Sequence, residues 1–86
     1  MSVEYYRKRF IDLRADVAKE REAKKRDNEH YADLVKRATS PSSKASYRKQ
    51  KIDRAASHDC RIESLKREIE RTNETLKRER ERAKKK

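Results

Sequence analysis

Glycine is absent from the 86 residues, tryptophan is absent too, and proline and cysteine each occur once. Without glycine no glycine-rich phosphate loop can form, and a helix loses its usual left-handed C-cap. A lone cysteine excludes a disulfide within the chain and favours a reducing compartment. No apolar run approaches the length of a membrane span, and the N-terminus does not resemble a signal peptide. We therefore expect a cytoplasmic protein without a membrane-spanning segment.

Apolar residues are also scarce, at 31% of the chain, whereas Asp, Glu, Lys and Arg make up 50%. So little apolar material cannot fill a globular core. A chain rich in Ala, Glu, Lys, Leu and Arg is typical of long helices and coiled coils, and the competing interpretation is disorder. The net charge of +11 favours an acidic partner.

The chain has one plausible break, at the serine-rich stretch around its only proline. A proline is costly inside a helix but harmless at the first helical position, so Ser40 as N-cap and Pro41 as first residue start a new helix. We divide the chain into a first helix (1–38), a turn (39–43), a second helix (44–83) and a basic tail (84–86), with helical conformation able to begin at Pro41. A single helix bent at the proline is the alternative.

Apolar residues recur at heptad spacing in both halves, which decides for coiled coil over disorder. Ile11 and Val35 lie beside the first stripe and widen it, as in a bundle rather than a two-stranded coil. The predicted self-association seam consists of Tyr6, Phe10, Leu13, Val17, Tyr31, Leu34, Ile52, Ile62, Leu65, Ile69 and Leu76.

If the chain reverses at the turn, residues that face each other have numbers that sum to about 82, so Leu13 meets Ile69. Lys24, in the polar middle of the first stripe, then faces the neighbourhood of Asp59, and such a polar layer can fix register and orientation. The fold class expected is all-α, an antiparallel two-helix hairpin. An isolated hairpin looks marginal, which predicts assembly into a larger helical bundle as a homodimer or higher oligomer.

Catalytic, cofactor-binding and metal-binding sites are not indicated. His58 and Cys60 could in principle ligate a metal, but residues two apart on a helix diverge, and no second cluster completes the site. Cys60 as a nucleophile would need a base and an orienting group. As a small residue in a weak part of the seam, Cys60 would need no such partners, and this is the simpler interpretation.

Nucleic-acid binding is the second functional hypothesis, because counterion release from phosphates would favour a basic tail. Acidic residues interspersed with the basic ones speak against it, as does the absence of a basic block ahead of a zipper. The candidate phosphate contacts are Arg78, Arg80, Arg82, Lys84, Lys85 and Lys86.

The segment Thr39-Ser40-Pro41-Ser42-Ser43, followed by Ile52-Asp53-Arg54, Arg61-Ile62 and Leu65, resembles the N-terminal coiled-coil region of bacterial Toll/interleukin-receptor (TIR) domain proteins and related antiphage effectors. The resemblance covers roughly residues 37 to 76 and departs from the family pattern at Lys44, where leucine is usual. It implies an oligomerisation or scaffold module that gathers effector domains. Cleavage of NAD, the family's usual activity, is not implied, because the residues for it are absent from this sequence.

Together these patterns predict a non-catalytic module that self-associates through its apolar stripe and gathers a partner or effector domain. A basic hairpin that binds nucleic acid is the alternative. No cofactor is expected in either case.

Overall fold

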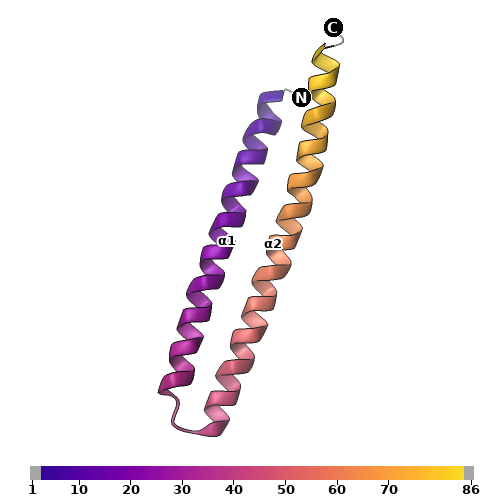
Figure 1. The fold of residues 1–86 in the computed structure, drawn as a ribbon. Coiled ribbons are helices and arrows are strands. Elements are labelled where there is room, and N and C mark those ends of the chain that lie inside the picture. The colour runs from indigo at the N-terminus through magenta and orange to yellow at the C-terminus, as the bar shows by residue number, and fades with distance from the viewer. Residues whose placement is uncertain (1–2, 85–86) are drawn as a thin grey trace.

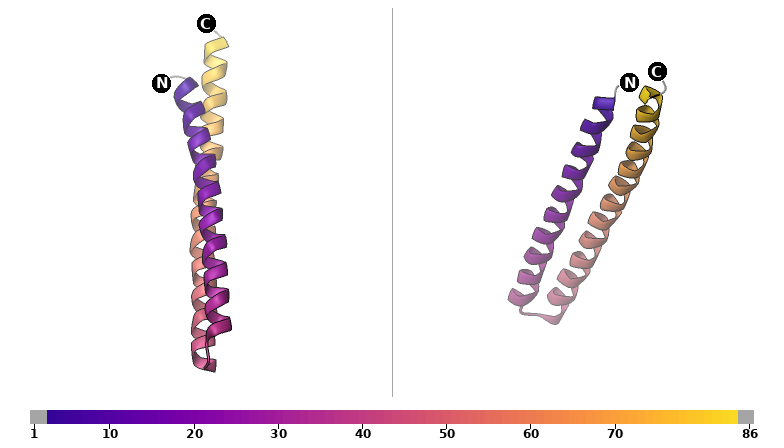
Figure 2. Two further views of the ribbon diagram at one scale, coloured as in Figure 1. Left: turned by 90° about the vertical axis from the view of Figure 1, so that its left-hand side faces the viewer. Right: turned by 45° about the horizontal axis from the view of Figure 1, so that its top comes forward.

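A computed structural model of the chain describes residues 3–84, which form two long helices and a short connection. Helix α1 spans Val3–Arg37 and helix α2 spans Pro41–Lys84. The helices run antiparallel, side by side and at a shallow angle, in a rod of 70 × 14 × 13 Å (Figures 1 and 2). The prediction of an all-α hairpin is therefore confirmed, and the single bent helix is excluded. Assembly into a larger bundle stays a prediction.

The turn is built by serine and proline, as the sequence predicts. The Ser40 hydroxyl accepts a hydrogen bond from the Ser43 backbone N–H at 3.1 Å, and the Ser40 carbonyl accepts one from the Lys44 N–H at 3.1 Å. Pro41 is the first residue of α2, so the helix begins inside the stretch 39–43 that we assigned to the turn. In the described part of the chain no residue has a positive φ, so the reversal needs no left-handed residue.

The core is a narrow seam between the helices. Leu13, Val17, Ile62 and Leu76 are buried, and Leu13 is only 2% exposed. Most of the other predicted seam residues are half-buried, namely Tyr6, Phe10, Tyr31, Leu34, Leu65 and Ile69. A two-helix rod can bury only one stripe of each helix, which is why so few side chains leave the solvent completely.

Ile52 is the exception, because it was predicted in the seam and is 68% exposed. Stepping back from Ile62 by four and three residues alternately, the seam of α2 passes through His58, Ala55 and Lys51, so Ile52 lies one residue outside it. Ile52 instead shares the heptad position of Asp59, on the flank of the seam. Ile52 was assigned to the seam because its side chain is apolar, but its heptad position lies outside the seam.

Ion pairs across the seam fix the register near the predicted one. Lys24 Nζ lies 2.7 Å from Asp59 Oδ1, and Glu20 Oε2 lies 3.2 Å from Arg61 Nε. Both pairs lie within one residue of the relation in which facing numbers sum to 82. Neither helix, over the residues described, contains an apolar stretch long enough to cross a bilayer.

Candidate functional site

The most densely connected polar group of the hairpin is centred on His58, at the middle of α2. Its Nδ1 lies 2.6 Å from Glu20 Oε1, and its Nε2 lies 2.6 Å from Asp27 Oδ2. Glu20 and Asp27 are seven residues apart, so they project from the same stripe of α1, two turns from each other. The imidazole ring sits between them and ties α2 to two points of α1.

Both contacts require the charged form of His58. An ionised carboxylate only accepts hydrogen bonds, and an imidazole donates from both nitrogens only when it is protonated. The two carboxylates therefore raise the pKa of His58, with the hydrogen bond to Asp27 as the larger cause and that to Glu20 as the next. The hydrogen bond from His58 likewise lowers the pKa of Asp27. We call Glu20, Asp27 and His58 the histidine clamp.

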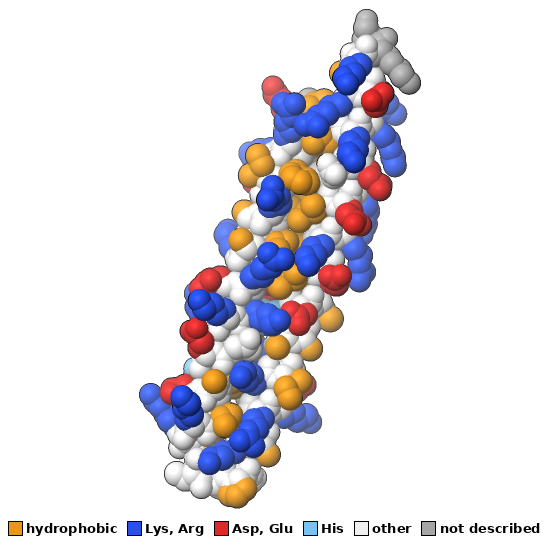
Figure 3. Space-filling view, in the orientation of Figure 1, with side chains coloured by type: hydrophobic (Ala, Val, Ile, Leu, Met, Phe, Trp, Pro, Cys, Tyr) orange, Lys and Arg blue, Asp and Glu red, His pale blue; other side chains and the backbone are white. Residues whose placement is uncertain are grey.

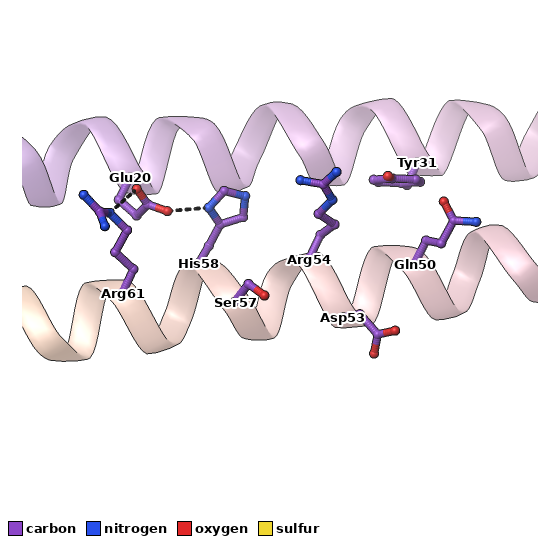
Figure 4. Close-up of a pocket in the computed structure, with 8 residues that line it drawn as sticks. All are labelled: Glu20, Tyr31, Gln50, Asp53, Arg54, Ser57, His58 and Arg61. Atoms are coloured by element: carbon purple, nitrogen blue, oxygen red, sulfur yellow. Dashed lines mark hydrogen bonds and ion pairs between the residues drawn. The ribbon is translucent and has the colours of Figure 1, made fainter.

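Two neighbouring cations surround the histidine clamp. Arg61, one turn further along α2, contacts the second carboxylate oxygen of Glu20, so Glu20 joins His58 and Arg61 (Figure 4). Arg54 extends toward α1 on the other side of His58, and its charge contributes to the lowered pKa of Asp27. The side chain of His58 is 15% exposed and that of Glu20 is 19% exposed, so the contacts are only partly shielded from water.

An open hollow of about 590 Å³ lies beside the histidine clamp. Its lining includes Glu20, His58 and the two arginines as well as Tyr31, Gln50 and Ser57, and Asp53 points away from α1 (Figure 4). Both ring nitrogens of His58 are occupied by carboxylates of α1. The arrangement can hold two helices together in a pH-dependent way, and it offers no free general base.

Metal binding has no support in the geometry. Among residues 3–84, no group of three or more His, Cys, Asp or Glu side chains is arranged to hold an ion. Cys60 is free and exposed, so it lies outside the seam in which the sequence analysis placed it.

His58 is the functional residue that the sequence analysis missed, since it was weighed only as a metal ligand. The signal was present, because the same register that pairs Lys24 with Asp59 places His58 opposite position 24, and Glu20 and Asp27 flank that position on one stripe. The polar layer was predicted correctly, but its central residue was not.

The basic residues predicted to contact phosphate do not form one free cluster. Arg78, Arg80, Arg82 and Lys84 are all exposed on α2, which continues past the start of α1 (Figure 1). Arg82 pairs with Glu79 at 3.3 Å, and Arg78 approaches Glu74 at 4.0 Å. The predicted contacts Lys85 and Lys86 lie outside the described residues. No protein-family model, curated protein or solved structure matches the chain, so its function has to be inferred from this geometry.

Proposed function

We propose that the chain is a non-catalytic assembly module of the cytoplasm, a helical hairpin that self-associates and gathers a partner. The observation that supports this best is its surface. The hairpin exposes 7045 Å², whereas a compact monomer of its 10.4 kDa would expose about 5,400 Å². The excess of about 1,600 Å² on one chain is about twice the 800 Å² that each partner buries in a standard protein–protein interface. Packing against further helices would complete a core that one hairpin leaves narrow.

We place the proposed self-association contact near the turn. Ile52 is 68% exposed, and it lines a shallow hollow of about 330 Å³ together with Asn28, Arg48, Lys51 and Ala55. Two copies that meet here around a two-fold axis would each cover the other's isoleucine, which is how homodimers commonly bury apolar surface. Val35, half-buried on α1, lies one heptad beyond Asn28 and so shares its flank of the helix. The resemblance of the turn to TIR-associated coiled coils makes an antiphage effector domain the proposed cargo.

Sedimentation velocity at about 50 and 200 mM salt tests self-association. Because apolar burial would drive it while like-charged copies repel, added salt should leave the oligomer intact or strengthen it. Ile52→Gln should weaken it. Ile11→Gln is the matched control, since Ile11 is 65% exposed but lies far from the turn. A chain that stays monomeric at both salt concentrations would refute the proposal.

Nucleic-acid binding is the second candidate, favoured by the exposed arginines at the end of α2. Their pairing with Glu74 and Glu79 reduces the charge available for phosphate. Affinity for a fluorescent duplex should fall roughly 10³- to 10⁵-fold between about 50 and 200 mM salt if six to ten phosphates are contacted. Truncation after Leu76 removes seven Lys and Arg residues, so it should abolish duplex binding while self-association persists. Equal duplex binding by the full and truncated chains would exclude the basic end of α2 as the binding site.

A further inference from the structure

The two faces of the hairpin use their charges differently. On the face of the histidine clamp, cations are paired with carboxylates of the other helix: Arg9 lies 3.1 Å from Glu68, and Arg61 lies 3.2 Å from Glu20. On the opposite face, the exposed cations Arg14, Arg21 and Lys66 have no carboxylate partner among the described residues. Arg14, Arg21 and Lys66 are therefore available to an acidic ligand on this face.

These three cations border an apolar groove between the helices. Its floor is formed by Phe10, Val17, Ala18 and Ile69, its volume is about 380 Å³, and no acidic side chain lines it. The Arg14 guanidinium lies 5.8 Å from the centre of the Phe10 ring, so the rim stands directly over the floor. Figure 3 shows this face, with hydrophobic side chains along the groove and Lys and Arg on both sides of it. We call this feature the basic-rimmed groove.

The basic-rimmed groove is separate from the proposed self-association contact. Asp59 lies one heptad from Lys66 and one heptad from Ile52, so it stands between them on the same flank of α2. Its ion pair with Lys24, at 2.7 Å, crosses the seam at that point and divides the groove from the Ile52 hollow. Each hollow can therefore take its own occupant.

We propose that the basic-rimmed groove binds an amphipathic helix with acidic flanks, contributed by the partner that the module gathers. The apolar floor suits residues spaced i, i+3 and i+7 on a helix, which is how such helices enter hydrophobic grooves. Arg14 and Arg21 are seven residues apart, about 10 Å along the axis, so acidic residues one heptad apart on the ligand would reach both. Lys66 faces the other flank of the ligand. The inference rests on the proposed assembly function and adds the chemistry of the partner.

Two other occupants fit less well. A second copy would bring the same unpaired cations against the rim, and its own apolar stripe is already used in its seam. A nucleic acid would find cations here, but the apolar floor between them offers nothing to a phosphate backbone. Charge and apolar surface together are matched only by an acidic amphipathic helix.

Fluorescence anisotropy with a synthetic peptide tests this. The probe is a labelled helix of about three heptads, with leucine at a and d and glutamate at e and g, and the reference is a scrambled peptide of the same composition. The full chain should bind the ordered peptide at least tenfold more tightly than the scrambled one. Equal binding would mean that charge alone attracts the peptide, which overturns the proposal.

Two sets of variants locate the contact. Replacing Arg14, Arg21 and Lys66 together by Gln should weaken binding about tenfold. The matched control replaces three other exposed cations, which lie on α1 outside the groove, by Gln and should change the affinity less than twofold; these are Lys8, Lys19 and Arg26. Equal losses in both triple variants would overturn the proposal.

A smaller change guards against misfolding. Ala18 is exposed on the floor of the groove, so Ala18→Gln should fill the groove, weaken binding and leave the helix content in circular dichroism unchanged. Unchanged peptide binding by this variant would overturn the proposal.

Sedimentation of the chain alone distinguishes the groove proposal from self-association. If the rim variant changes self-association and the peptide does not bind, a second copy occupies the groove. Tight duplex binding that the rim variant abolishes would assign the groove to nucleic acid.

Discussion

The histidine clamp predicts that the hairpin is most stable at mildly acidic pH. The raised pKa of His58 means that its contribution to the free energy of unfolding is complete below the unfolded-state value of about 6.5. That contribution is lost as the pH rises through the folded-state pKa, which lies above 6.5. The lowered pKa of Asp27 acts at the other end, because its contribution is present above about 4 and is lost as the pH falls further. Stability should therefore be greatest between roughly pH 4 and 6.5.

The size of the effect follows from the burial of the clamp. Hydrogen bonds to charged groups contribute about 1.5–3 kcal/mol when shielded, and exposed ion pairs contribute about 0.2–1 kcal/mol. With His58 15% exposed and Glu20 19% exposed, we take an intermediate value of about 1–2 kcal/mol for the loss of the imidazolium. For a domain of this length, that corresponds to a fall in Tm of roughly 4–15 °C once the pH has risen past the folded-state pKa of His58.

Thermal unfolding followed by circular dichroism, at fixed protein concentration, measures this directly. His58→Gln should lower the Tm at pH 5.5 and remove most of its dependence on pH, whereas His30→Gln, at the only other histidine, should leave that dependence intact. Rising pH also reduces the net positive charge, which acts in the opposite direction and is the same in His58→Gln. A wild-type Tm that falls no more than that of His58→Gln would refute the clamp.

Other variants test the seam and the turn. Leu13→Ala should cost about 2–5 kcal/mol and half-buried Ile69→Ala less, and the two together should cost less than their sum if they are in contact, as chemical denaturation would show. Ile52→Ala should cost under about 0.5 kcal/mol in the monomer, since its side chain is exposed; a loss above 2 kcal/mol at concentrations where the chain is monomeric would contradict the seam described here. Ser40→Ala should cost about 0.5–2 kcal/mol and Ser42→Ala almost nothing, and equal losses would count against the N-cap.

The fold could be predicted from the sequence because its determinants are local and periodic. The heptad spacing of Leu13 and Val17, together with one proline after Ser40, leaves a hairpin as the simplest solution, and the register follows from the length of the turn. In the division of the chain, α2 was predicted to start three residues too late. A run of serines is typical of a turn, but here Ser40 is the N-cap and the helix already begins at Pro41.

The site was harder to predict because it depends on contacts between the helices. Ile52 was placed in the seam on its apolar character, although its spacing from Ile62 puts it on the flank. His58 gives no pattern of its own, and its role appears only when the stripe that carries Glu20 and Asp27 is laid against it. Unpaired cations such as Arg21 could not be told from paired ones such as Arg9, because both look alike in the sequence.

The position of the polar layer in the middle of the rod gives it one more consequence. A heptad stripe repeats, so sliding one helix along the other by seven residues still sets apolar residues against apolar ones at many points. The same slide would leave His58 beside only one of Glu20 and Asp27, which are themselves seven residues apart, and it would separate Lys24 from Asp59. The polar centre of the seam therefore favours one register among the several that the heptad repeats on either side of it would allow.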